Sequence, residues 1–172
     1  ADELSIGAKV TGSGGSAANG SVTLGSNSTL MKGTETAPAI LRIGYNGDNN
    51  PTSGGFGNAV GVFDALETSA TLDLQLSELS VGRSAGGGAT GTLYWDQSEA
   101  IHASAVYFGL GGSANGILDT PAGGTFLLGT ADAPIDTLRL GYQNVGNGTA
   151  QGHLDFTVTN PTFTAHIADE LS

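Results

Sequence analysis

The chain has 172 residues, of which 29 are glycine and none is cysteine, and its formal net charge at pH 7 is −11. Only five residues are basic and they form no cluster, which disfavours nucleic-acid binding. Without cysteine there are neither disulfides nor thiolate metal sites, and no apolar run is long enough to insert into a membrane.

A four-residue pattern, apolar–any–apolar–Gly, recurs through the chain and organises it. The alternation predicts a strand with one buried face, and the glycine predicts a sharp bend that a side chain would resist. The five occurrences are Leu4-Ser5-Ile6-Gly7, Leu41-Arg42-Ile43-Gly44, Leu79-Ser80-Val81-Gly82, Val106-Tyr107-Phe108-Gly109 and Leu138-Arg139-Leu140-Gly141, and a sixth begins at Leu171-Ser172. In chain order their first residues lie 37, 38, 27, 32 and 33 positions apart. A strand and a bend at a nearly constant spacing, with insertions between them, are typical of a stacked repeat.

The pattern divides the chain into five units, and each unit is expected to contain two further short strands. In chain order these strands are predicted at residues 21–25 and 29–33, 60–64 and 70–76, 91–96 and 101–105, 116–119 and 125–129, and 152–156 and 162–167. Residues 33–38 and 129–134 are also similar, and each segment leads into Leu-Arg-apolar-Gly-Tyr. This internal duplication supports the interpretation as a repeat protein.

These features predict an all-β fold, more narrowly a β-solenoid of about five coils, each with three short strands and variable loops rich in Gly, Asn and Ser. The coils would span residues approximately 4–40, 41–78, 79–105, 106–137 and 138–170 of a single segment covering residues 1–172. Strands of successive coils would pair in parallel, about 4.8 Å apart, and inward Leu, Ile, Val and Phe would form a continuous core. The end coils of such a stack keep open strand edges, which invite another copy.

A larger repeat encloses the smaller one. Residues 1–5 and residues 168–172 are both Ala-Asp-Glu-Leu-Ser, at an offset of 167 residues. The match indicates that the chain is about one period of a longer tandem array. We therefore expect the partner of this chain to be itself, head-to-tail in a filament or as covalent tandem repeats.

The motifs L-x-I-G, G-x-L-D and T-F-T-A, found here at residues 41–44, 116–119 and 162–165, resemble the repeats of long bacterial extracellular β-solenoid proteins. This group includes autotransporter-like passengers and fibrous adhesins. The resemblance implies an elongated protein located outside the cell or at the cell surface, with a structural or adhesive role. It transfers no catalytic residue and no cofactor.

Four acidic residues are candidate calcium ligands, because carboxylates repeated at one position of a stack would offer rows of oxygen atoms. They are Asp64, Asp119 and Asp155, which end the G-x-L-D type segments, and Asp48 in the long second loop. The interpretation we favour is that these side chains cap turns by accepting hydrogen bonds from nearby backbone N–H groups. Calcium thus stays a possible cofactor without an assigned site.

Two arginines, Arg42 and Arg139, occupy the outward position of the repeated strand. Pairing on the surface with acids such as Glu78 or Asp136 is the expected role of these arginines. Exposed pairs of this kind contribute little to stability, so they point to a solvated face rather than to a ligand site.

Three functions remain open on the sequence. The favoured one is a structural building block of an extracellular fibre, sheath or surface stalk, assembled by end-to-end stacking. The second is an adhesin module that binds a glycan or a surface receptor through the long loop near Tyr45 to Gly57. The aromatic residues Tyr94, Trp95 and Tyr107 could also bind a glycan, although Trp95 could instead belong to the core. The third is a polysaccharide-active β-helix enzyme, whose chemistry needs clustered carboxylates or a base beside a metal. Because the sequence contains no such cluster, we expect no enzyme activity.

Overall fold

The protein was analysed as a computed structural model that describes residues 2–10, 16–47, 57–144 and 148–171. These residues form fourteen β-strands and no helix, which confirms the predicted all-β class. In chain order the strands are β1 (Glu3–Lys9), β2 (Ala18–Thr23), β3 (Thr29–Lys32), β4 (Ala39–Asn46), β5 (Ala59–Ala65), β6 (Thr71–Ser84), β7 (Ala89–Trp95), β8 (His102–Gly111), β9 (Ala114–Asp119), β10 (Thr125–Leu128), β11 (Ile135–Tyr142), β12 (Gln151–Leu154), β13 (Thr162–Ala165) and β14 (Ile167–Leu171). A helix able to span a membrane is absent from the described part of the chain.

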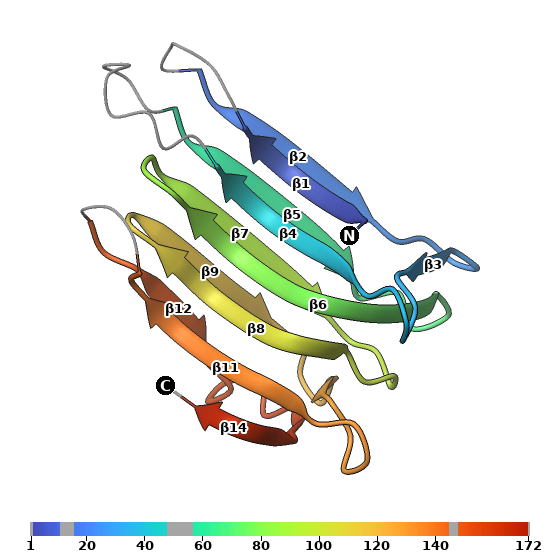
Figure 1. Cartoon of the computed structure of the whole chain (residues 1–172). Helices are drawn as coiled ribbons and strands as arrows, with labels where there is room; N and C mark the ends of the chain where they lie inside the picture. Colours follow the sequence, from blue (N-terminus) through green and yellow to red (C-terminus); the bar gives the residue numbers. More distant parts are fainter. Residues whose placement is uncertain (1, 11–15, 48–56, 145–147, 172) are drawn as a thin grey trace.

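The strands pair in two main parallel sheets, as the stacked pattern predicts (Figure 1). The front sheet has the order β1-β4-β6-β8-β11-β14, and the rear sheet has the order β2-β5-β7-β9-β12. Short side strands complete the arrangement, because β3 pairs with the beginning of β6 and β10 pairs with β13. Apart from the side strands β3, β10 and β13, successive strands therefore alternate between the two sheets. Within each sheet, every strand lies beside the preceding strand of the same sheet.

The register of the front sheet follows the spacing of the repeated pattern. The first residues of successive occurrences are direct partners, in the order Leu4, Leu41, Leu79, Val106, Leu138 and Leu171. A slip by one residue would turn each buried side chain toward solvent, which is why the alternating pattern specifies this register so strongly. The connections between the strands differ in length and accommodate the unequal spacings, so the pairing of these first residues is kept.

Two rows of glycine hold the front and rear sheets in backbone contact. The bend glycines of the front sheet, Gly7, Gly44, Gly82, Gly109 and Gly141, have φ between 63° and 74°, a conformation that other residues rarely adopt. A second row lies in register on the rear sheet and consists of Gly20, Gly61, Gly91, Gly116 and Gly152. A Cβ atom on any member of the second row would fall within 3.0 Å of front-sheet backbone atoms. The sheets can approach this closely only because both rows lack side chains.

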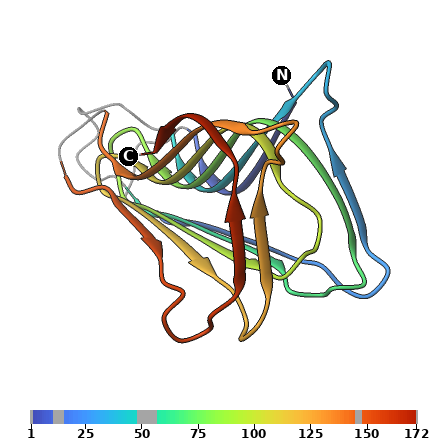
Figure 2. The ribbon, with the colours of Figure 1, turned by 90° about the horizontal axis from the view of Figure 1, so that it is seen from below.

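The core fills the space that opens away from the glycine rows. Figure 2 shows the front and rear sheets converging on one side and diverging toward β10 and β13 on the other. Large side chains occupy the wide side: Trp95 is only 1% exposed, and its ring meets the ring of Phe126 edge-on with centroids 6.2 Å apart. Burying a large apolar side chain contributes about 1.5–3 kcal/mol relative to exposure. The buried apolar rows therefore hold neighbouring strands, and the two facing sheets, together.

The second and third units depart from the expected three short strands. The last predicted strand of each unit, at residues 70–76 and 101–105, is continuous with the next strand of the repeated pattern, as part of β6 and of β8. In place of a side strand, the third unit makes only an isolated bridge between Ile101 and Leu128. The 27-residue spacing from Leu79 to Val106 is the shortest in the chain, which leaves too few residues for a separate strand and two turns.

Candidate functional site

The outer face of the front sheet collects all three arginines and three of the four tyrosines of the chain. Two rows of outward positions run across the strands. The first row is Ser5, Arg42, Ser80, Tyr107 and Arg139, and the second row is Ala8, Tyr45, Arg83, Leu110 and Tyr142. We call these two rows the arginine–tyrosine face. Because the two rows flank the bend glycines, a residue of the second row follows its neighbour in the first row by three positions.

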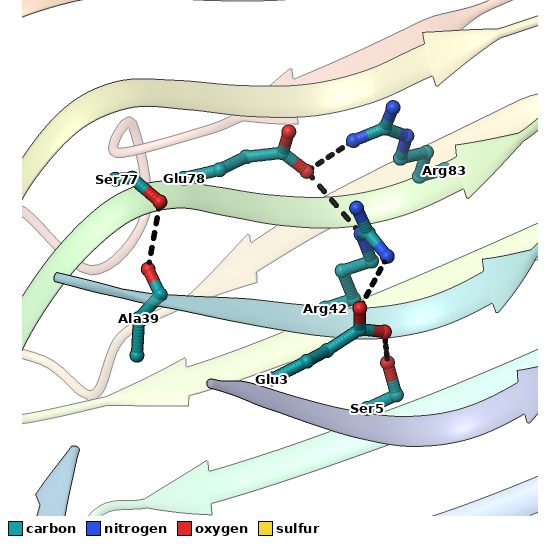
Figure 3. Close-up of polar contacts among 7 residues, drawn as sticks. All are labelled: Glu3, Ser5, Ala39, Arg42, Ser77, Glu78 and Arg83. Atoms are coloured by element: carbon teal, nitrogen blue, oxygen red, sulfur yellow. Dashed lines mark hydrogen bonds and ion pairs between the residues drawn. The ribbon is translucent and has the colours of Figure 1, made fainter. Parts of the chain in front are cut away.

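An ionic network ties together the first three strands of this face (Figure 3). The Arg42 guanidinium contacts a carboxylate oxygen of Glu3 at 2.8 Å and one of Glu78 at 3.5 Å, and Arg83 also pairs with Glu78. The side chains of Arg42 and Glu78 are 13% and 19% exposed. Exposed ion pairs contribute about 0.2–1 kcal/mol, and partial burial weakens the screening by salt. The predicted Arg42–Glu78 pair is present, and the network as a whole carries no net charge.

Each Leu-Arg-apolar-Gly-Tyr segment brings its arginine over its tyrosine ring. The Arg42 guanidinium lies 4.4 Å from the centre of the Tyr45 ring, and the Arg139 guanidinium lies 4.1 Å from that of Tyr142. Stacking of a cation on an aromatic ring stabilises by about 0.5–1 kcal/mol at exposed sites. The two segments that looked duplicated in the sequence therefore form the same local structure.

The two end surfaces of the molecule are the second candidate site. The N-end surface is formed by β1, β2 and β3, and the C-end surface by β12, β13 and β14. Apolar side chains of the core rows reach both surfaces: Leu171 is 68% and Phe163 38% exposed at the C-end, and Leu4, Val22 and Leu30 are partly buried at the N-end. Strand edges also present unpaired backbone N–H and C=O groups. Each end surface is therefore suited to pairing with further strands.

The aspartates proposed as calcium ligands lie apart from one another. On the outer face of the rear sheet Tyr94 pairs with Asp64 on one side and Asp119 on the other, so an aromatic residue separates the two carboxylates. Asp64 accepts a hydrogen bond from the Leu66 N–H at 3.2 Å. Within the described residues no group of three or more His, Asp or Glu is arranged to hold a metal ion. The fourth candidate, Asp48, lies outside the described residues.

Asp155 likewise bonds to its own turn. Its carboxylate accepts hydrogen bonds from the Thr157 hydroxyl at 2.6 Å and the Thr157 N–H at 2.9 Å. These bonds favour the charged form and lower the pKa of Asp155 below its ordinary value. The pKa of Glu67 is lowered in the same way by hydrogen bonds from Ser69. Both carboxylates stabilise the turn that follows a rear-sheet strand, Glu67 after β5 and Asp155 after β12.

The long loop of the binding hypothesis, residues 45–57, lies mostly outside the described residues. Its base is held by Asn46, whose side-chain amide donates to the carbonyl oxygens of Gly57 at 2.8 Å and Gly88 at 3.2 Å. Of the aromatic residues considered for sugar binding, Trp95 is buried in the core and cannot serve as a surface platform. Tyr107 lies on the arginine–tyrosine face, which the sequence did not reveal as one surface.

A shallow depression beside the front sheet is the nearest approach to a catalytic cleft. Its lining includes Glu35 from the turn before β4, His102 from the beginning of β8 and Asp136 from the beginning of β11. The depression is open, and its three titratable groups come from one turn and the first residues of two strands rather than from one strand face. The geometry therefore offers the enzyme hypothesis no shielded acid–base pair.

Comparison with known proteins gives no relative from which a role could be transferred. No protein-family model, curated protein or solved structure matches the chain. The function is therefore argued from the fold, the arginine–tyrosine face and the end surfaces.

Proposed function

We propose that this chain is a β-solenoid segment that serves as a structural building block of an extracellular fibre, sheath or surface stalk, assembled by end-to-end stacking. The observation that carries the proposal is the continuity of the core rows. The leucine row from Leu4 to Leu171 and the rear-sheet glycine row from Gly20 to Gly152 both run from the N-end surface to the C-end surface. Each row presents the same type of residue at both ends, so each row can be continued by the strands of a further unit.

The energetics of the ends support the same conclusion. Leu171 at the C-end is an apolar side chain of a core row that is left 68% exposed. Burying apolar surface stabilises by about 25 cal/mol per Å², and a further strand also satisfies the backbone groups of the edge. Stacking gains on both counts, and these gains have to exceed the repulsion between copies that each carry a net charge of −11.

The mechanical role follows from the direction of the backbone hydrogen bonds. In parallel pairs these bonds run from strand to strand, so in a stack they point along its axis. The ionic network of Arg42 with Glu3 and Glu78 adds side-chain contacts between the same strands. Load along the fibre would therefore be carried by many equivalent bonds rather than by one interface.

Electron microscopy of the purified chain, combined with fibre diffraction, tests the proposal. We expect thin filaments with a strand repeat of about 4.8 Å along the axis. Leu171→Lys should abolish the filaments, because it places a charge in the apolar row at the C-end surface. Val60→Lys is the matched control: Val60 is also exposed but lies on the outer face of the rear sheet, away from both ends. Dispersed compact particles at all concentrations, or equal loss of filaments in both variants, would contradict the proposal.

An adhesin or glycan-binding module is the second candidate function. The observation in its favour is the arginine–tyrosine face, where Tyr45, Tyr107 and Tyr142 lie on one open side of the sheet. Tyrosine rings provide flat amphipathic contact area that suits sugars. Replacing residues 48–56 by a Gly/Ser linker of equal length, and separately Tyr107 and Tyr142 by alanine, would distinguish the two roles. Loss of glycan binding with intact filaments would favour the adhesin role.

A further inference from the structure

The C-end surface is stepped, whereas the N-end surface is level. Among the described residues the front sheet has six strands in its order and the rear sheet has five. At the N-end, β1 of the front sheet is backed by β2, and a Cβ on Gly20 would lie 2.5 Å from the Gly7 nitrogen. At the C-end β14 extends the front sheet beyond β11, and no rear-sheet strand backs it (Figure 1). The front sheet therefore projects by one strand.

The projecting strand has the sequence and the register of β1. Residues 168–172 repeat residues 1–5 letter for letter. Leu171 pairs with Leu138 as the last member of the leucine row in which Leu4 is the first member. Glu170 likewise pairs with Thr137, in the row that Glu3 begins opposite Ile40. Position by position, β14 stands where the first strand of another unit would stand.

Resting on the proposed stacking function, we propose that successive units share this strand. Residues 168–172 then take the place of residues 1–5 of the following unit, and the array repeats every 167 residues rather than every 172. The occupant of the C-end surface is a second copy of this chain that enters the stack after its fifth residue. Its first residue is Ile6, and the bend glycine Gly7 follows it and completes the repeated pattern.

The shared strand places each segment of the following unit on a matching edge. The segment equivalent to Ala18–Thr23 pairs with β12, so that Gly20 follows Gly152 in the glycine row and Val22 follows Leu154 in the next core row. The segment equivalent to Thr29–Lys32 pairs with β13, where Leu30 of the following unit covers Phe163. Phe163 already stacks on Phe126 with ring centroids 5.9 Å apart, so this contact continues an existing apolar row.

A second copy that stacked as a complete 172-residue unit would fit less well. Its β1 would pair with β14, and the front sheet would then be one strand ahead of the rear sheet throughout the second copy. The rear sheet and the side strands would each lack a strand at the junction, leaving a gap of about 4.8 Å. The two modes of joining therefore differ in the packing of the junction and can be told apart by experiment.

Two double-length proteins test the shared strand. The first joins residues 1–172 directly to residues 6–172, and the second joins residues 1–172 to a complete second copy, residues 1–172. Amide hydrogen exchange of Ile167–Leu171 in the first copy, which is the β14 segment at the junction, reports on how well the junction is closed. We expect exchange in the first protein to be at least tenfold slower than in the second, and the first protein to melt in a single transition above that of the single unit.

The outcomes separate this inference from the proposed function. Equal protection of β14 in the two double-length proteins, or better protection in the second, would overturn the shared strand while leaving stacking in place. If instead both proteins melt at the temperature of the single unit, and β14 exchanges as fast as it does there, the copies do not stack and the proposed function itself fails.

Discussion

Replacing Gly91 with alanine tests whether the two sheets are in backbone contact at the glycine rows. Gly91 lies in the middle of β7, and its φ is outside the left-handed region, so alanine meets no backbone strain there. The added Cβ would lie 2.9 Å from the carbonyl carbon of Val81 and closer still to the Ile43 oxygen and the Gly82 nitrogen. All three atoms belong to the backbone of the front sheet. The sheets would have to separate locally by about 1 Å, which a close-packed interior resists.

The expected loss is about 3 kcal/mol or more. Overpacking a core costs typically about 1–3 kcal/mol, and here no flexible side chain can move aside. Alanine returns about 0.4–1 kcal/mol by restricting the unfolded chain, which reduces the loss without reversing it. For a chain of this size such a loss lowers the melting temperature by about 6–12 °C. Urea unfolding followed by the fluorescence of the single tryptophan measures the change.

Two further glycines separate steric overlap from backbone strain. Gly123 has φ of 71° and nothing within 4 Å of an added Cβ, so Gly123→Ala should cost about 1 kcal/mol from strain alone. Gly25 has neither feature, because its nearest neighbour would be the Ser28 hydroxyl at 3.9 Å. Gly25→Ala should leave stability within about 0.5 kcal/mol. A loss at Gly91 no larger than that at Gly123 would refute the contact between the sheets.

Four other substitutions probe the core, the arginine–tyrosine face and the turns. Phe126→Ala should lower the free energy of unfolding in urea by about 3–5 kcal/mol, and Phe163→Ala should lower it by less than half as much. The reason is that the Phe126 ring is fully buried whereas Phe163 is 38% exposed. Equal losses would mean that the C-end surface is already covered. Arg42→Lys keeps the charge but loses the planar stacking on the tyrosine ring, so it should cost about 1 kcal/mol, and unchanged thermal unfolding would contradict the geometry. Thr157→Val should raise the pKa of Asp155 part of the way toward its ordinary value in an NMR titration, because valine lacks the hydroxyl whose hydrogen bond lowers it most, while the backbone N–H bond stays. Because the folded-state pKa of Asp155 is the lower one, its stabilisation is present above the unfolded-state pKa of about 3.9 and is lost as pH falls through the folded-state pKa. The wild type and the variant should therefore differ in stability above the unfolded-state pKa and converge below the folded-state pKa.

The all-β class and the parallel pairing were predictable because one local signal carries both. An apolar–any–apolar–Gly segment is a strand with a defined inner face and a required bend, and its repetition makes parallel neighbours of residues such as Leu41 and Leu79. The strand boundaries were less predictable. In the second and third units the strands beginning at Thr71 and His102 run on into the repeated pattern, because no turn residue interrupts them.

The features that the sequence did not reveal all depend on contacts between distant segments. The rear-sheet glycine row escaped notice because a glycine such as Gly91 needs no special φ and is explained only by the backbone opposite. Glu3 was likewise missed as a partner of Arg42, which lies 39 positions away and becomes a neighbour only through the parallel register. Local patterns predict strands, but which side chains meet across strands depends on the register as a whole.

The in-register parallel pairing also determines how the chain would yield under tension. Tension applied along the stack pulls strands apart one after another, because the backbone bonds of each strand run across to the neighbouring strand, on a slant, rather than along it. Between one pair of leucine-row partners and the next the chain contains 27 to 38 residues. Each detachment would release about 90–130 Å of extended chain. A stack of such units would lengthen in many small steps of nearly constant force, as a shock-absorbing tether does.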